Sequence, residues 1–367
     1  MKLIIQPYCD WDGHYYDYIN NLKIKNSIKV YCDNKKRKIN DSIFIKTLVK
    51  DYRYNFITFI LSRLFNYFKV IFFLTFRYKN KNQVKIIHFL EFEPISILLY
   101  IILNIFKLPN LIITIHSINP TLSNSFFKNI IIYFQRLLFT LVILLLNFFP
   151  VKIVVHSHNH KKKLSKIFKK TIKVFNYPCE IVNKNNLNKI FNKKILFFGL
   201  VREDKGIIDF VKKNKLEKLI LTIAGKVNSK SMIQLKKYKN LKIKIKNKYF
   251  SKNELENLFL SHDYLLLPYK KGYAGSAGPM HISLSYGLPI ICSNIEIFRD
   301  FLKQNKVGVL YQDSKFEKNI LSINKKKFSQ MKNNCISFSK KNTWFHLSKH
   351  YERLYDKIKQ KETYKKR

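Results

Sequence analysis

Short apolar runs alternate with longer amphipathic segments along the first half of the chain. The runs predicted to be buried strands are Leu3–Ile5, Ile28–Cys32, Val84–His88, Leu111–His116 and Val151–His156. Runs of about four to eight apolar residues bounded by turn formers are consistent with parallel strands that are covered on both faces. The segments between them are long enough for crossover helices, so the pattern predicts a parallel α/β domain.

The alternation of strands and helices starts again after the polar run 183–194. The predicted strands of this second half are Ile195–Gly199, Leu219–Gly225, Ile243–Ile245 and Tyr264–Pro268. We therefore expect a first α/β domain over residues 1–182, a linker over 183–194, a second α/β domain over 195–340 and a C-terminal helix over 341–367.

The stretch from Tyr273 to Asp300 carries the strongest local signal. It opens on a loop of small residues, Gly275, Ser276, Ala277 and Gly278. A predicted helix follows, with Pro279 in its first turn and Gly287 at its end. Small residues leave the backbone N–H groups at the helix entrance uncovered, where an anion such as a phosphate would bind. A tight strand-to-helix turn without a ligand explains the same residues.

The glycine content strengthens the interpretation of this loop as a binding site. The chain has nine glycines, and Gly13 is the only one that precedes Gly199. In a chain so poor in glycine, the remaining glycines are expected where the backbone needs a left-handed conformation or a close approach.

The charge balance points to an anionic membrane surface as a partner and away from nucleic acid. The formal net charge is +46, with 69 Lys and Arg against 23 Asp and Glu. The lysines are scattered and arginines are few, whereas a nucleic-acid binder is expected to cluster arginines with stacking aromatics. Basic residues close to a bilayer attract anionic lipid head groups.

The cysteines and the N-terminus suggest a cytoplasmic protein. The five cysteines are widely spaced and form no Cys-x-x-Cys pair, which indicates a reducing compartment and no structural zinc. The apolar run at the N-terminus is too short for a signal peptide.

Two long apolar segments lie in the first half of the chain. Phe56–Phe76 mixes aromatic residues with Arg63 and Lys69, which is typical of a helix at a membrane interface or of a buried amphipathic helix. Phe126–Phe149 is more hydrophobic, but Lys128 and Arg136 interrupt it. Its uninterrupted part is expected to be too short to span a bilayer.

Three residues of the first half are candidates for ligand contact. Gly13 and His14 follow the first predicted strand, and His116 ends the fourth. The carboxyl ends of parallel strands are where doubly wound folds bind ligands. Ordinary solvent-exposed loop residues are the alternative.

Two further clusters allow a structural and a chemical interpretation. Glu91 and Glu93 precede a proline, where a solvated turn is favoured over an acid–base pair. His156, His158 and His160 alternate after a strand, and ordinary loop histidines are favoured over a metal site because no carboxylate or cysteine is nearby.

Arg202 and Lys205 form the main basic candidate of the second half. They follow the strand Ile195–Gly199 on a loop that ends at Gly206. If this loop faces the small-residue loop 275–278, the two cations would hold a diphosphate. Two solvated cations in a lysine-rich chain are the alternative.

The order of these motifs resembles the C-terminal domain of family 4 retaining glycosyltransferases of the GT-B fold, of the bacterial surface-polysaccharide type. The resemblance is carried by Gly199, Arg202, Lys205, Gly206, Ala224, Gly225, Asp263, Gly287, Pro289, Asp300 and Gly308. The first half is similar more loosely, through Gly13, His14 and His116. The ending, with Trp344, Tyr351 and Tyr355, looks like the family's C-terminal helices, which cross back to the first domain.

The resemblance implies an α/β GT-B fold, in which two doubly wound Rossmann-like domains enclose a cleft. It also implies a hexosyltransferase-like, metal-independent enzyme without a cofactor, whose donor is a nucleotide-diphosphate sugar. Arg202 and Lys205 would hold the diphosphate with the loop 275–278, and His116 would touch the donor sugar as the catalytic residue. Gly13 and His14 would form a donor or acceptor loop. The expected acceptor is lipid-linked or a surface polysaccharide, such as lipopolysaccharide or capsule, at the inner face of the plasma membrane.

The sequence departs from the family at two positions. The family's two glutamates correspond to Ala274 and Ile282, counted back from Gly287. Their absence leaves two alternatives open: a catalytically inactive GT-B scaffold that binds a membrane or a partner enzyme, and a nucleotide-sugar epimerase on the same fold.

Overall fold

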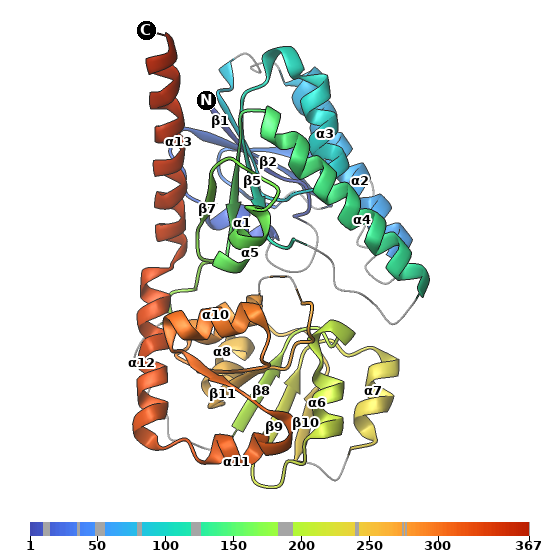
Figure 1. Cartoon of the computed structure of the whole chain (residues 1–367), viewed down its shortest axis with the longest axis vertical. Helices are drawn as coiled ribbons and strands as arrows, with labels where there is room; N and C mark the ends of the chain where they lie inside the picture. The colour runs from blue at the N-terminus through green and yellow to red at the C-terminus, as the bar shows by residue number, and fades with distance from the viewer. Residues whose placement is uncertain are drawn as a thin grey trace. The chain divides into compact units, whose positions relative to one another are not determined.

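The protein, described here as a computed structural model, divides into two compact units (Figure 1). Unit 1 comprises Met1–Ile118, Ile130–Asn176 and Trp344–Arg367, and unit 2 comprises Asn119–Asn129 and Tyr177–Thr343. The structure describes residues 1–9, 15–34, 37–47, 56–78, 83–118, 126–182, 194–238, 242–273, 275 and 277–366.

Unit 1 is built on a seven-stranded parallel sheet. Its strands are β1 (Lys2–Gln6), β2 (Ser27–Asp33), β3 (Ser42–Lys46), β4 (Ile86–Phe89), β5 (Asn110–Ile115), β6 (Val151–Val155) and β7 (Ile172–Val174). Their order in the sheet is β3-β2-β1-β4-β5-β6-β7. The order reverses beside β1, as in doubly wound folds, so the carboxyl ends of the central strands meet at one edge.

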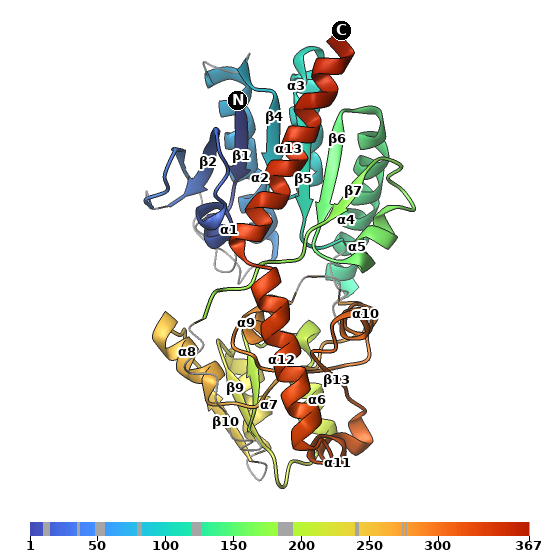
Figure 2. The same ribbon diagram turned by 90° about the vertical axis from the view of Figure 1, so that its left-hand side faces the viewer.

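Helices cover both faces of this sheet. They are α1 (Tyr15–Asn21), α2 (Phe56–Phe72), α3 (Pro94–Leu103), α4 (Phe126–Leu145), α5 (His158–Leu164) and α13 (Trp344–Lys366). Helices α2, α3 and α4 lie on one face, and α13 runs along the other (Figures 1 and 2). Because neighbouring residues of a strand point to opposite faces, Ile87 and Phe89 pack into the core under α2–α4. His88, between them, points toward α13.

Unit 2 is a smaller doubly wound unit with a six-stranded parallel sheet. Its strands are β8 (Lys194–Phe198), β9 (Ile220–Ala224), β10 (Ile243–Lys246), β11 (Tyr264–Leu267), β12 (Ile290–Cys292) and β13 (Gly308–Leu310). They pair in the order β10-β9-β8-β11-β12-β13. The helices are α6 (Ile207–Lys213), α7 (Ser229–Lys236), α8 (Lys252–Leu260), α9 (Gly278–Ser285), α10 (Glu296–Asn305), α11 (Phe316–Leu321) and α12 (Lys325–Lys341).

The predicted fold class, two parallel α/β units, is confirmed. Local signals are confirmed as well: α9 begins at Gly278 with a proline in its first turn and is followed by Gly287, whose φ is +62°. The strands β3, β7 and β13 were not predicted. Strand β3 lies at the edge of the sheet, its apolar run is only Ile43–Ile45, and none of its residues is fully buried.

The part expected to be too short to span a bilayer, Leu137–Phe149, lies mostly in a longer helix, α4. In the described part of the chain, Asn129–Phe148 is the one helical stretch long and apolar enough to cross a membrane, and 28% of it is buried. This stretch includes Arg136, so it is longer than the uninterrupted apolar part that follows the arginine.

Candidate functional site

The carboxyl edge of the unit 2 sheet is built from glycine backbone. Gly199 follows β8 with φ +117°, and Gly225 follows β9 with φ +130°. A Cβ on Gly225 would lie 2.2 Å from the carbonyl oxygen of Gly199. Only glycine allows this approach and this backbone conformation. Strands β8 and β9 are therefore each followed by a glycine, so no side chain covers the backbone at these two positions.

The side chain of Lys205 is buried at this edge. Lys205 ends a 3-10 turn (Glu203–Lys205), and its side chain is 9% exposed. Its Nζ lies 2.8 Å, and Pro279 Cγ 3.7 Å, from where a Cβ on Gly199 would stand. The ammonium group therefore sits between the end of β8 and the first turn of α9, as expected for a cation that faces the loop 275–278.

Lys205 is a buried cation that the described residues do not neutralise. Its Nζ lies 5.7 Å from the centroid of the Tyr269 ring, and none of the ion pairs found in the described ranges includes it. Burial first, and then the neighbouring charge of Arg202, lower the pKa of Lys205 to about 8. A dianionic ligand would supply the missing countercharge.

Arg202, the second predicted cation, is already paired. Its Nη2 lies 2.7 Å from Asp204 Oδ2, and its Nε donates to Asp204 Oδ1 at 3.1 Å. The two residues belong to the same turn, so this bidentate pair forms locally. The sequence did not reveal this pairing, and the predicted clamp of Arg202 and Lys205 on a diphosphate stays a prediction.

The entrance of α9 is open. Ala277 is the N-cap residue and is buried, and among the described residues no atom beyond the helix itself and the chain neighbours lies within 4 Å of where a Cβ on Gly278 would stand. Gly275 is described and half-buried, whereas Ser276 lies outside the described residues. Ile282, where the resembling family has a glutamate, packs against the core of unit 2.

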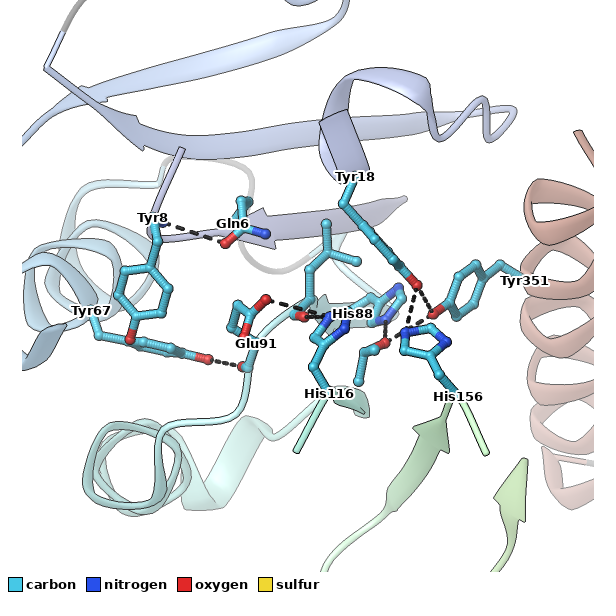
Figure 3. Close-up of polar contacts among 11 residues, drawn as sticks. Gln6, Tyr8, Tyr18, Tyr67, His88, Glu91, His116, His156 and Tyr351 are labelled. Atoms are coloured by element: carbon cyan, nitrogen blue, oxygen red, sulfur yellow. Dashed lines mark hydrogen bonds and ion pairs between the residues drawn. The ribbon is translucent and has the colours of Figure 1, made fainter. Parts of the chain in front are cut away.

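His116 lies at the carboxyl edge of the unit 1 sheet, directly after β5 (Figure 3). Its Nε2 donates to the carbonyl of Leu90 at 3.0 Å and lies 3.4 Å from Glu91 Oε1. Its ring packs against Tyr18 and His156, with centroids 5.2 and 4.7 Å away. The imidazole is thus held in one orientation. Gly13 and His14, the other candidates of this half, lie outside the described residues.

Beside His116, a chain of hydrogen bonds joins three strands to α1 and α13 (Figure 3). His88 bonds Tyr355 through Nδ1 at 2.7 Å and Thr114 through Nε2 at 2.8 Å. Thr114 bonds the Tyr351 hydroxyl at 2.9 Å, and this hydroxyl bonds that of Tyr18 at 2.9 Å.

For a neutral His156, the bond at the far end of this chain sets the direction of the hydrogen bonds in it. His156 Nδ1 lies 2.7 Å from the carbonyl of Phe175, which can only accept. A neutral His156 then accepts from Tyr18 at 3.3 Å through Nε2. Each hydroxyl along the chain donates once and accepts once, until His88 accepts from Tyr355.

The hydrogen-bonded chain of unit 1 is uncharged, whereas the edge of unit 2 carries the ammonium of Lys205. Burial first, and then His156, lower the pKa of His88 to about 3, so His88 is uncharged at neutral pH. Burial raises the pKa of Tyr351 to about 12. Groups of this kind bind hydroxyls better than phosphates.

Two preferences from the sequence are corrected here. Glu91 and Glu93 are buried and are not part of a solvated turn: Glu93 caps α3 by accepting from Ser96 N at 2.7 Å. His158 and His160 lie in helix α5 and not in a loop. No cluster of three potential metal ligands occurs within the described ranges.

The chain has the GT-B fold of nucleotide-sugar glycosyltransferases. Solved structures align with nearly all of it, at identities that show the fold alone. Sucrose-phosphate synthase from Thermosynechococcus elongatus aligns with a TM-score of 0.72 at 12% identity, over 97% of this chain and 98% of that one. Anabaena HepE in complex with UDP and glucose aligns with a TM-score of 0.68 at 10% identity, over 97% and 100%. WaaG, a glycosyltransferase involved in lipopolysaccharide biosynthesis, gives 0.61 at 11% identity, over 96% and 99%.

The sequence of unit 2 matches a protein family. Residues 181–342 match the family model described as "Glycosyl transferases group 1". A comparison with curated proteins gives no match. Together, the family match and the structural neighbours support a glycosyltransferase of the GT-B superfamily.

Proposed function

We propose that this protein transfers a sugar from a nucleotide-diphosphate donor to a lipid-linked or surface-polysaccharide acceptor, with retention at the anomeric carbon. One observation carries the donor part of the proposal. The buried ammonium of Lys205 lies at the entrance of α9, beside the bare backbone of Gly199, and no described carboxylate pairs with it.

The chemistry of the donor site follows from this arrangement. A diphosphate at the entrance of α9 would accept hydrogen bonds from the uncovered N–H groups and from Lys205. When the bond between sugar and phosphate breaks, negative charge grows on the leaving oxygen. A cation fixed at that place stabilises the transition state more than the ground state, without a metal or cofactor in the proposal.

His116 is the proposed sugar-contacting catalytic residue. Glu91 and the Leu90 carbonyl fix its ring, so the imidazole can meet a sugar hydroxyl without having to be ordered first. Gly13 and His14 remain proposed contacts of the same half.

The acceptor and the location follow from weaker observations. The structural neighbours include WaaG, named for its involvement in lipopolysaccharide biosynthesis, and HepE, solved with UDP-glucose. Together with the high positive charge, they favour an acceptor at the inner face of the plasma membrane and disfavour nucleic acid.

Binding of a panel of UDP-, GDP- and ADP-sugars tests the proposal. We expect one nucleotide class to stabilise the wild type against thermal unfolding. Lys205→Ala should lower its affinity about 100-fold, since charge-assisted bonds to phosphate contribute up to about 3 kcal/mol. Lys213→Ala removes a lysine that is exposed and paired with Asp313, and it should bind normally.

The inactive-scaffold alternative rests on Ile282, whose apolar side chain packs into the core where the family has a glutamate. If no nucleotide sugar stabilises the wild type, the transferase proposal is wrong and the scaffold is favoured. Conversion of a bound nucleotide sugar without any acceptor would point to an epimerase.

A further inference from the structure

The helix layer α2–α4 of unit 1 is apolar on both of its sides. Its inner side belongs to the unit 1 core, to which α4 contributes Phe139, Val142 and Ile143. Its outer side is equally apolar: α4 exposes Phe134 and Leu137 on the side away from the sheet. A helix that is hydrophobic all round is stable in water only if something covers both sides.

All three helices of the layer expose large apolar side chains. Most of the large apolar side chains that the described residues expose belong to these helices and the short turns that end them. Phe65 and Phe72 are exposed on α2, and Ile102 on α3. Helices α2 and α3 are in contact, and the three helices cover one face of the sheet (Figure 1). Monomeric soluble proteins rarely expose apolar surface of this extent.

Each helix of the layer ends in an exposed phenylalanine, and we call these three residues the apolar tips. Phe76 lies in the turn after α2, Phe106 in the turn after α3 and Phe148 in the turn after α4. Their exposed fractions are 60%, 99% and 83%. The turns precede β4, β5 and β6, which are neighbours in the sheet, so the tips gather along its amino edge.

A cation accompanies every tip. Arg77 follows Phe76, and Lys107 follows Phe106. Lys170 Nζ donates to the carbonyl of Phe149, directly after Phe148, which places a cation beside the third tip. Aromatic side chains next to basic ones are the residues that anchor proteins at the boundary between lipid head groups and acyl chains.

Charge decides which partner covers this surface. Helices α2, α3 and α4 contain no Asp or Glu, and the chain carries a formal net charge of +46. A second copy of the chain would bring like charge to the same face, which opposes self-association. An anionic bilayer offers opposite charge at its surface and an apolar interior below it.

We propose that the outer side of α2–α4 docks on an anionic lipid bilayer, with the apolar tips inserted among the lipids and α4 lying in the plane of the interface. Helix α4 has the length to span a bilayer, but its inner residues Phe139, Val142 and Ile143 are fixed in the unit 1 core. To cross the membrane it would have to leave the sheet. The proposal names the surface behind the proposed membrane location and does not depend on sugar transfer.

Flotation of the full chain with vesicles tests this proposal. The vesicles contain phosphatidylcholine alone or with about 30 mol% phosphatidylglycerol, enough for a negative surface potential. The tip variant carries Phe76→Ser, Phe106→Ser and Phe148→Ser. Its control carries Ile233→Ser, Tyr249→Ser and Phe345→Ser, which replace three exposed large apolar residues outside the layer, with exposed fractions between 59% and 64%.

The wild type and the control should float with the anionic vesicles. The tip variant should bind about 1000-fold more weakly, or about tenfold per inserted phenylalanine. A charge variant with Arg77→Gln, Lys107→Gln and Lys170→Gln should lose about fivefold per residue on anionic vesicles and little on neutral ones. Thermal unfolding of each variant confirms that it is folded.

Three results would overturn the proposal. A folded tip variant that floats like the wild type would show that the tips do not insert. Wild type and tip variant that both resist extraction by alkaline carbonate would identify α4 as a spanning helix. A wild type that ignores vesicles and is a dimer in solution, while the tip variant is a monomer, would assign the face to a second copy. Nucleotide-sugar binding is measured separately, so its failure leaves the vesicle result intact.

Discussion

The two parallel sheets differ in the residues that lie at their carboxyl edges. In unit 2 the edge consists of glycines with left-handed backbone and one buried ammonium, that of Lys205. In unit 1 the edge consists of histidines, a threonine and tyrosines that bond one another. The same fold thus carries glycine backbone and one buried ammonium at the edge of one sheet, and hydrogen-bonded uncharged side chains at the edge of the other.

A single added methyl group should disrupt the carboxyl edge of the unit 2 sheet. Gly225→Ala should destabilise the protein by about 3 kcal/mol or more, because its Cβ would meet the Gly199 carbonyl at 2.2 Å with φ at +130°. Gly278→Ala is the matched control, since no atom lies within 4 Å of its Cβ position. Urea unfolding measures both variants. Equal midpoints would show that the bare backbone of this edge is not required by packing.

Two of the buried histidines, one in each unit, sharpen the comparison in terms of stability. His88 in unit 1 is hydrogen-bonded through both nitrogens, whereas Nδ1 of His281 in unit 2 has no hydrogen-bond partner among the described residues. His88→Leu should cost about 2 kcal/mol or more, because Thr114 and Tyr355 lose a partner. His281→Leu should be neutral or stabilising within about 1 kcal/mol. A larger cost for His281→Leu would contradict the assigned difference.

The same two histidines should make the protein sensitive to acid. Burial lowers the pKa of each to about 3, while an unfolded histidine titrates near 6.5. Between these pH values the unfolded chain binds more protons, so the free energy of unfolding should rise with pH. Either Leu variant should reduce this slope by up to about 1.4 kcal/mol per pH unit. An unchanged slope in both variants would show that neither histidine is neutral in the fold.

The sequence predicted the fold better than it predicted the sites. Apolar runs between turn formers revealed the central strands, because a strand buried on both faces needs them. The order of Gly199, Arg202, Lys205 and Gly206 pointed to a basic loop after β8, and in the structure Lys205 Nζ and Pro279 Cγ both lie close to Gly199. The pairing of Arg202 with Asp204 depends on side-chain conformation in one turn, which no pattern encodes.

The hydrogen-bonded chain of unit 1 was beyond reach of sequence patterns for a different reason. His88 and Tyr355 are separated by 267 residues and meet only because α13 packs on the sheet. The residue types do indicate that such a contact exists, since a histidine inside an apolar strand needs a polar partner. The spacing of Tyr351 and Tyr355, one helical turn apart, marks the face that supplies it.

The charge of the unit 2 edge predicts how donor binding depends on pH. Burial and Arg202 lower the pKa of Lys205 to about 8. The amine is therefore largely protonated at neutral pH and loses its proton as the pH rises above about 8. The affinity for a nucleotide diphosphate should therefore fall about tenfold per pH unit above pH ~8. Lys205→Arg keeps its charge and should remove this dependence. Calorimetric titration of the bound nucleotide measures it, and a flat profile for the wild type would exclude Lys205 from the site.

The smallest expected effect concerns the cation that is already paired. Arg202 is half-exposed and bonded to Asp204, so Arg202→Ala should weaken nucleotide binding only about threefold, in the range of exposed ion pairs. Asp204→Asn keeps the shape of the turn but releases the guanidinium, and it should tighten binding about fivefold at low salt. The two variants, measured beside Lys205→Ala with the same nucleotide, rank the two cations. If Arg202→Ala instead costs as much as Lys205→Ala, the guanidinium must leave Asp204 when the diphosphate binds, and the turn Glu203–Lys205 would be a part of the donor site that rearranges.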